Sequence, residues 1–541
     1  MAPPGSAAWG RWLARLGPSE LAGWLSRSGG LGARLARCTA GSGAPPAGRA
    51  QPIASLGGRR RLGPLEGLGP LEGLGPLGRL GSLGWGRGLG SASRPLPITS
   101  GKPAAATYYS GVDIADLGYK GLEITGISIT PVAFTDPPLL NQVGVHQPFA
   151  LRAIIEVHTG SGLTGLGETY GDADHLERLG AVARAIIGAD VFAQHQVRAR
   201  VGQSLAGVVG GDTHGLTGVV TPGGTIDRVY APFEVACLDV AGRALGRPVS
   251  DLLGGAVRDR VPFSAYLFYK WAGHPGAEPD EWGEALGPPG IVAQARRLID
   301  EYGFSAIKLK GGFFPPDVDV EVIQALRQEF PDLPLRLDPN GAWTPATSVK
   351  VGQALTGVLE YLEDPTIGIS QMAEVARQVP MPLATNMCEV DFEHIAPAVA
   401  EGAVSIILSD HHYWGGLRRS ADLARICATF GLGLSMHSNS HLGISLAAMT
   451  QLAAATPELT YACDTHWPWK RPGEDVIEPG SLKFRDGSVD VPTTPGLGVE
   501  LDGDALARLH EQYERTPIRT RDDTGYMRQF DRTFPRVTPR W

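Results

Sequence analysis

Three short apolar runs between residues 306 and 365 end in polar residues: Ala306–Gly312 (AIKLKGG), Pro334–Trp343 (PLRLDPNGAW) and Glu360–Pro365 (EYLEDP). The pattern continues on both sides, giving eight strand-like ends at Tyr266, Lys308/Lys310, Asp338, Glu363, Asn386, Asp410, His437 and Asp464. From Lys310 onward these ends are 23 to 28 residues apart, which is the length of one strand–helix unit. The spacing predicts an α/β fold, a (β/α)8 barrel that gathers these polar side chains at one rim. An open doubly wound sheet would show the same alternation, but it binds ligands at a switch point and does not need eight polar strand ends.

A smaller α+β module precedes the predicted barrel. Leu122–Phe134 and Ala150–His158 alternate as strands do, and Leu176–Ile187 and Arg228–Leu245 carry apolar residues at helical spacing. We interpret Gly165–Gly171 (GLGETYG) as a glycine-rich turn. The expected organisation is an N-terminal α+β capping domain over residues 120–255, a barrel over 256–470 and a C-terminal segment over 471–541 that returns to the cap.

Residues 1–104 differ from the rest of the chain in composition. Leu62–Gly81 (LGPLEGLGPLEGLGPLGRLG) is nearly periodic, and its prolines and glycines recur too often for a helix or a strand. We therefore predict a disordered, low-complexity leader. Three origins stay open, namely translated upstream sequence of a GC-rich gene, which we favour, a flexible interaction tail, or an Arg-rich targeting peptide.

The charge of the chain is unevenly distributed. The 541 residues include 48 Lys+Arg and 56 Asp+Glu, a formal net charge of −8. Residues 1–100 contain 12 Arg, 3 Glu and no Lys or Asp, a charge of +9, which leaves −17 for the rest. An acidic body argues against a nucleic-acid partner, and the absence of a long apolar run argues against a membrane partner. Five scattered cysteines without CxxC spacing predict neither a disulfide framework nor a zinc cluster, and indicate the cytoplasm.

Three of the strand ends have the chemistry of a metal site. Asp338, Glu363 and Asn386 end successive strands, so a barrel would place them side by side on its rim. Oxygen ligands with room for water suit Mg²⁺, a hard octahedral cation. A single residue of this kind is more often a helix cap, but three at successive units favour the metal site.

Two further groups could exchange protons with a ligand. Lys308 and Lys310 are two residues apart on one strand, so both side chains should point into the barrel. We expect the two ammonium groups to depress each other's pKa, which suits one of them to act as a base. His437 could be oriented by Asp410, which ends the preceding strand, although a core histidine with satisfied hydrogen bonds is the alternative. Together with a metal, these groups could remove a proton α to a carboxylate and stabilise the enolate.

These residues resemble the enolase superfamily, its mandelate racemase/muconate lactonizing enzyme-like branch and, within it, the glucarate dehydratase family. The matching motifs occur in the family's order over roughly residues 120–535. They are Lys308-Leu-Lys310-Gly-Gly312, Leu337-Asp-Pro-Asn-Gly-Ala-Trp343, Glu363-Asp-Pro365, Ala384-Thr-Asn-Met387, His437-Ser-Asn439, Asp464-Thr-His-Trp467, Pro495-Gly-Leu-Gly-Val-Glu500 and Arg521-Asp-Asp523.

The resemblance implies a TIM-like, modified (β/α)7β barrel and a Mg²⁺-dependent hydro-lyase. Its reaction would be the loss of water from D-glucarate to give 5-dehydro-4-deoxy-D-glucarate. Lys310 would remove the α-proton of one epimer, His437 with Asp410 would serve the other, and Lys308 and Asn340 would stabilise the enolate oxygen. The implied metal ligands are Asp338, Glu363 and Asn386. The implied substrate contacts are His146, Tyr266, Ser438, Asn439, His466 and Arg521.

Two positions depart from the family's pattern. A second Glu expected six residues after Glu363 is Ile369, and a Thr expected before the helix around Phe233–Leu245 is Ala231. The alternatives are a dehydratase or an epimerase of another acid sugar, such as galactarate or talarate, and a non-catalytic relative that uses the barrel for binding. The expected partners are a small dicarboxylate acid sugar and further copies of the chain in a homo-oligomer.

Overall fold

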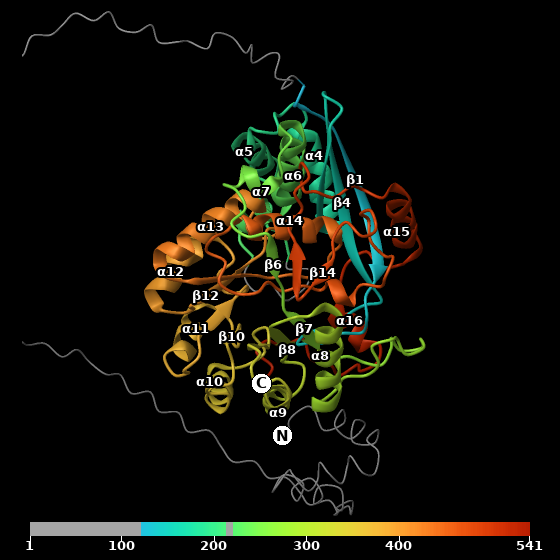
Figure 1. Ribbon diagram of the computed structural model, residues 1–541. Coiled ribbons are helices and arrows are strands. Elements are labelled where there is room, and N and C mark those ends of the chain that lie inside the picture. Colours follow the sequence, from blue (N-terminus) through green and yellow to red (C-terminus); the bar gives the residue numbers. More distant parts are fainter. Residues whose placement is uncertain (1–120, 212–219) are drawn as a thin grey trace, which may run out of the picture. The chain divides into compact units, whose positions relative to one another are not determined.

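The computed structural model describes residues 121–211 and 220–541, and Val112–Trp541 forms one compact unit (Figure 1). Its N-terminal part contains a three-stranded antiparallel sheet in the order β1-β4-β5, with β1 (Ile124–Thr135), β4 (Phe149–Thr159) and β5 (Thr164–Tyr170). Helices α4 (Ala173–Ile186), α5 (Gln194–Ser204) and α6 (Pro222–Leu245) follow and share an apolar core with this sheet. We call this part the cap. The predicted leader, residues 1–104, lies outside the described residues.

Strand β5 corrects one expectation from the sequence. Residues 165–170 of this stretch, interpreted above as a turn, are extended and pair along β4 from Arg152 to Val157. The glycines are explained by helix α6, which packs directly against them. A Cβ on Gly165 would lie 2.0 Å from the carbonyl oxygen of Ala236, and one on Gly167 would lie 2.2 Å from that of Pro232. Glycine is therefore required for close packing between helix and strand, and not for a turn.

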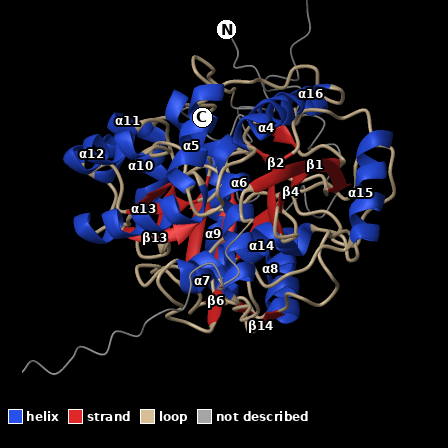
Figure 2. Cartoon of the chain, turned by 90° about the horizontal axis from the view of Figure 1, so that it is seen from above, coloured by secondary structure: helices blue, strands red, loops and turns tan. Residues whose placement is uncertain are grey.

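The second part is a parallel barrel whose strands follow chain order in one sheet. They are β7 (Ala265–Phe268), β8 (Ile307–Lys310), β9 (Leu335–Asp338), β10 (Tyr361–Glu363), β11 (Leu383–Thr385), β12 (Ile406–Ser409) and β13 (Gly433–Met436). The helices between and after them are α8 (Pro288–Tyr302), α9 (Pro316–Glu329), α10 (Pro345–Ala354), α11 (Ile369–Ala376), α12 (Phe392–Glu401), α13 (Gly416–Phe430) and α14 (Gly443–Ala454). They lie on the outside of the strands, as Figure 2 shows for α10 to α13. The prediction of a barrel with an N-terminal cap is confirmed.

The eighth strand position is filled by residues 463 and 464 without a regular strand. The Asp464 N–H donates to the carbonyl of Met436 on β13, and the Ser264 N–H next to β7 donates to the carbonyl of Cys463. These two bonds close the ring between β13 and β7. Side chains at both ends of the sheet thus face one shared interior, with an apolar core around it.

The remaining α-helices and strands belong neither to the cap as defined above nor to the strand–helix units of the barrel. They are β2 (Leu140–Asn141), β3 (Gly144–Val145), α7 (Val249–Leu252), β6 (Arg260–Pro262), β14 (Phe484–Arg485), β15 (Ser488–Asp490), α15 (Gly503–Arg515) and α16 (Asp523–Arg528). Helix α15 lies along β1, where Gln512 donates to the carbonyl of Ala133 (Figure 1). The C-terminal segment therefore contacts the cap.

Two further properties concern the described residues as a set. Cys237, Cys388, Cys427 and Cys463 are buried and unbridged there. None of the helices within residues 121–211 and 220–541 is both long and apolar enough to cross a membrane.

Candidate active site

A cavity lies at the carboxyl ends of the barrel strands, where the cap meets the barrel. The structure brings most of the predicted site residues together around it. Those lining it are His146, Tyr266, Lys310, Asn340, Asn386, His437, Ser438, Asn439, His466 and Arg521. The other predicted residues, Lys308, Asp338, Glu363 and Asp410, are buried behind this lining and contact it.

Lys308 is the centre of a buried cluster of carboxylates. Its Nζ lies 2.7 Å from Glu363 Oε1, 2.7 Å from Asp464 Oδ2 and 3.4 Å from Asp338 Oδ2, and none of these side chains is exposed. Burial alone would lower the pKa of Lys308, but Asp464 and Glu363 outweigh it and raise this pKa well above the ordinary value. The expectation that the neighbouring lysine would depress this pKa is therefore wrong for Lys308, because three carboxylates surround it.

Lys310 occupies a different environment on the same strand. Its Nζ lies 2.8 Å from Asp338 Oδ2, and it lines the cavity. The other carboxylate oxygen of Asp338 accepts the Asn340 backbone N–H at 3.0 Å, and the Tyr266 hydroxyl donates to Oδ2 at 3.2 Å. Burial raises the pKa of Asp338, but Lys310 and Lys308 outweigh this effect and hold it below the ordinary value. The carboxylate therefore stays ionised beside the amine.

The predicted metal ligands form a set that fits a divalent cation. Asp338 ends β9, Glu363 ends β10 and Asn386 follows β11, and the Asn386 amide lies 3.2 Å from Glu363 Oε1. Burial and the nearby Asp338 raise the pKa of Glu363 well above its ordinary value. A cation between two such carboxylates would remove their repulsion, and two carboxylates with an amide oxygen are donors that Mg²⁺ prefers. The residues present thus fit the expected ion.

His437 faces the cavity from the opposite part of the rim, after β13. Its Nδ1 lies 2.9 Å from Asp410 Oδ2, and its ring stacks on Tyr413 with the centroids 5.9 Å apart. Burial would raise the pKa of Asp410, but His412 and His437 hold it well below the ordinary value. The Nδ1 of His437 is therefore held by an ionised partner, and its Nε2 is left to face a ligand in the cavity.

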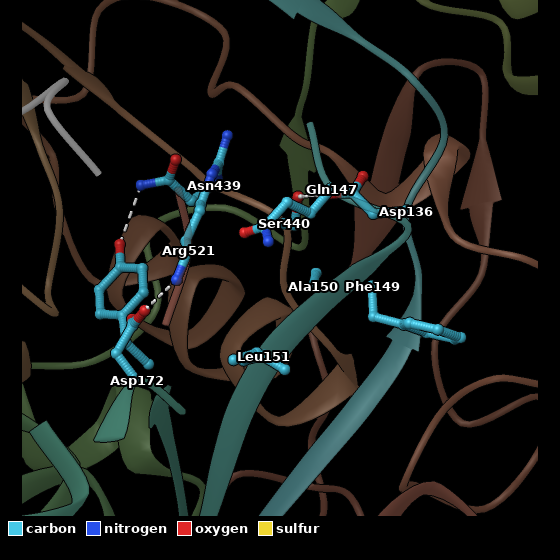
Figure 3. A pocket seen from close by; sticks show the side chains of 10 residues that line it. Asp136, Gln147, Phe149, Ala150, Leu151, Asp172, Asn439, Ser440 and Arg521 are labelled. Atoms are coloured by element: carbon cyan, nitrogen blue, oxygen red, sulfur yellow. Dashed lines mark hydrogen bonds between the residues drawn. The ribbon is translucent and has the colours of Figure 1, made fainter. Parts of the chain in front are cut away.

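Polar groups from the cap and the C-terminal segment line the far end of the cavity. Arg521 uses its Nε and Nη2 on Asp523, at 2.9 and 2.8 Å, and this partner raises its pKa against the effect of burial. The end-on edge of the Arg521 guanidinium, formed by Nη1 and Nη2, can bind a ligand. His146 pairs with Asp136 at 3.0 Å. A second cavity adjoins the first, with Arg521 and Asn439 in the lining of both (Figure 3).

Sequence reasoning missed several residues of this cavity. Phe268 lines it two residues after Tyr266, and the strand period of two could have identified it. Asn141 and Tyr413 lie outside the barrel strands, and no pattern in the sequence points to them. The two departures lie elsewhere, since Ala231 is buried in α6 and Ile369 begins α11, where it packs against the core.

Comparisons with known proteins show the family to which the chain belongs. Residues 290–505 match the family described as Enolase C-terminal domain-like. The chain is 51% identical over 433 residues to a probable glucarate dehydratase of Streptomyces coelicolor, covering 78% of this chain and 100% of the relative.

Solved structures similar to this chain belong to the same group of enzymes. An enolase of Thermobispora bispora complexed with magnesium and formate is 64% identical, with a TM-score of 0.77 over 78% of this chain and 100% of that one. An enolase of Mycobacterium smegmatis complexed with tartrate is 67% identical, with a TM-score of 0.75 over 78% of this chain and 99% of that one. With its barrel, its cap and these relatives, the chain belongs to the enolase superfamily, in which it is a glucarate dehydratase-like enzyme.

Proposed function

We propose that this enzyme is a Mg²⁺-dependent dehydratase of six-carbon dicarboxylate sugars, with D-glucarate as the first candidate. One observation carries the proposal, namely that an amine and an imidazole from opposite parts of the rim, Lys310 and His437, line one cavity with Arg521. Two opposed bases suit removal of an α-proton from either face of a carbon, and an arginine suits a second carboxylate. The probable glucarate dehydratase of S. coelicolor supports this substrate class.

Each group has a role that follows from its environment. Lys310 takes the α-proton of one epimer, and His437, oriented by Asp410, takes that of the other and returns a proton to the departing hydroxide. Lys308, kept charged by its carboxylates, and the Asn340 amide stabilise the negative charge that develops on the substrate carboxylate. Magnesium, held by Asp338, Glu363 and Asn386, would supply further positive charge there.

The remaining polar groups would hold the substrate in place. His146, Tyr266, Ser438, Asn439 and His466 contact its hydroxyl groups, and the end-on edge of Arg521 binds the distal carboxylate. The side-on edge of Arg521 is already occupied by Asp523, so that the guanidinium is positioned before the substrate arrives.

The direct test is incubation of the purified protein with Mg²⁺ and D-glucarate, L-idarate, galactarate or talarate, followed by NMR detection of a keto-deoxy diacid. Glucarate or idarate should give product. If none of the four acids gives a keto acid, the dehydratase proposal is wrong.

The two-base assignment has its own test in D₂O. Lys310→Met should abolish solvent exchange of the α-proton in one epimer, and His437→Asn should abolish it in the other. Each variant controls for the other, because a general loss of structure would affect both epimers. Normal turnover in both variants would contradict the assignment.

An epimerase is the second candidate, because the same pair of opposed bases interconverts epimers when no β-hydroxyl leaves. The NMR experiment distinguishes the two reactions directly. An epimerase gives the second aldarate without a keto acid, whereas a dehydratase gives the keto acid from both epimers.

A further inference from the structure

One carboxylate in this site holds two histidines. Asp410 Oδ2 binds Nδ1 of His437 at 2.9 Å, and Oδ1 binds Nδ1 of His412 at 2.8 Å and the His412 backbone N–H at 2.9 Å. His437 lines the cavity, whereas His412 lies behind Asp410 and is only 5% exposed. Asp410 therefore connects the cavity to a residue that no ligand in it would touch.

The protonation of His412 follows from its second ring nitrogen. His412 Nε2 has two partners, Nη2 of Arg152 at 2.9 Å and the hydroxyl oxygen of Ser445 at 3.0 Å; a hydroxyl can donate or accept, but a guanidinium can only donate. Nε2 must accept, so the ring proton is on Nδ1 and points at Asp410. His412 is thus a neutral donor, and Asp410 keeps a full negative charge for His437. The same arginine argues against a metal ion at Asp410, His411 and His412, although their ligand atoms lie close together.

Arg152 is itself fixed between the cap and the barrel. It lies on β4, is 1% exposed, and donates from Nε to Glu168 Oε1 on β5 at 2.8 Å. Glu168 also accepts the backbone N–H groups of Leu442 and Ser445, both at 2.8 Å. These residues begin α14, directly after the loop that carries His437. The cap therefore holds the rear of the histidine site through one buried ion pair.

We propose that His412 and Arg152 are positioning residues for His437. Arg152 sets the tautomer of His412, His412 fixes the rotation of Asp410, and Asp410 aligns the His437 ring with its Nε2 toward the cavity. The inference rests on the proposed function in one respect, that His437 exchanges protons with a substrate. Misalignment of a reacting group by about 1 Å costs roughly 10²-fold in rate, so the effect is measurable.

The kinetic test uses His412→Leu and His412→Asn. Leucine removes the donor to Asp410, whereas the asparagine amide can replace Nδ1–H. We expect His412→Leu to slow α-proton exchange on the His437 side roughly 10²-fold and to change the Lys310 side by less than about threefold, with His412→Asn largely restoring the former. Equal losses on both sides, or no loss, would overturn the proposal.

The second test does not depend on turnover. In protein labelled with ¹⁵N-histidine, the NMR couplings of His412 should show a proton on Nδ1 and a bare Nε2 at pH 7, and Arg152→Lys should keep this tautomer. A proton on Nε2 of His412 in the unmodified protein would overturn the proposal. If the unmodified protein exchanges neither epimer, the proposed function fails, and the tautomer still decides this inference.

Discussion

At the scale of single residues, the site contains two neighbouring lysines with different electrostatic environments. Lys308 and Lys310 are alternate residues of β8, yet three carboxylates surround the first and one contacts the second. The alternation of the strand was sufficient to predict that both lysines point inward. The sign of the pKa shift at Lys308 was not predictable, because Asp464 and Glu363 reach it from distant positions in the chain.

Glu363 provides a prediction about the metal. Without a cation, its carboxylate is paired with the buried amine of Lys308, so Glu363→Gln should lower the melting temperature in EDTA by leaving that charge with one partner fewer. The same change should abolish the thermal stabilisation by Mg²⁺ and weaken Mg²⁺ affinity roughly 100-fold or more, measured by calorimetry and by melting curves.

The matched control is Glu360→Gln, three residues earlier, whose carboxylate binds Arg336 instead. That variant should keep the Mg²⁺ response. An unchanged Mg²⁺ response in Glu363→Gln would remove Glu363 from the metal site.

Glu389 provides a prediction about pH. It is 1% exposed, neither carboxylate oxygen has a hydrogen-bond partner among the described residues, and burial followed by the nearby Asp364 raises its pKa to about 8. An unfolded glutamate ionises near pH 4.5, so this group costs stability as the pH rises from about 4.5 to 8, by up to about 1.4 kcal/mol per unit.

Glu389→Gln should therefore match the unmodified protein near pH 5 and exceed its free energy of unfolding at pH 8, measured by denaturant titration. The exposed Glu393→Gln on α12 serves as the control and should change neither value. A variant that is less stable at pH 8 would show that the Glu389 carboxylate is ionised and bound in the folded state.

At the scale of elements, a segment could be predicted from the sequence where its own apolar pattern determines its structure, and could not where packing against a distant segment does. The barrel strands were predictable because each combines an apolar run with a polar end at a regular spacing. Strand β5 was not predictable, because its glycines allow α6 to pack closely against it, whereas in a sequence such glycines usually indicate a turn. Helix α5 also went unpredicted, since only Gln194, Val197 and Val201 of its residues are buried and its apolar stripe is thin.

The α6–β5 contact gives the third prediction. Gly167→Ala would place a methyl group against the backbone of Pro232 and should destabilise the protein by more than about 2 kcal/mol. Gly180→Ala in α4 is the control, because a Cβ there meets no atom within 4 Å, and it should stabilise by about 0.5–1 kcal/mol. Denaturant unfolding measures both. Equal effects at the two positions would contradict the packing explanation.

At the scale of the whole molecule, the charge asymmetry and the comparisons both separate about the first hundred residues from the rest of the chain. The relative from S. coelicolor is covered completely by 78% of this chain, and Val112–Trp541 forms its own unit. The net charge of the acidic body would repel the proposed dicarboxylate, so binding it would require local attraction by Lys308, Lys310, Arg521 and the expected metal. The cytoplasmic location and the homo-oligomer stay predictions.

The fourth prediction concerns the N-terminal residues. A chain that starts at residue 112 should keep its melting temperature and its kcat/KM within about twofold, because no part of the described site comes from residues 1–111. Thermal melts and the glucarate assay measure the two quantities. Lost activity or precipitation of the shortened chain would show that the first 111 residues contribute to the working enzyme.

The buried pair of Arg152 and Glu168 has a consequence for recombination between related enzymes. A chimaera with its crossover between α6 and β7 would take Arg152 and Glu168 from one parent and the backbone of Leu442 and Ser445, with His412, from the other. Exchange of the cap should then be tolerated only between parents that both make these contacts among Arg152, Glu168, His412 and the start of α14. The cap therefore cannot be exchanged independently of the barrel, because this ion pair and its partners lie across their boundary.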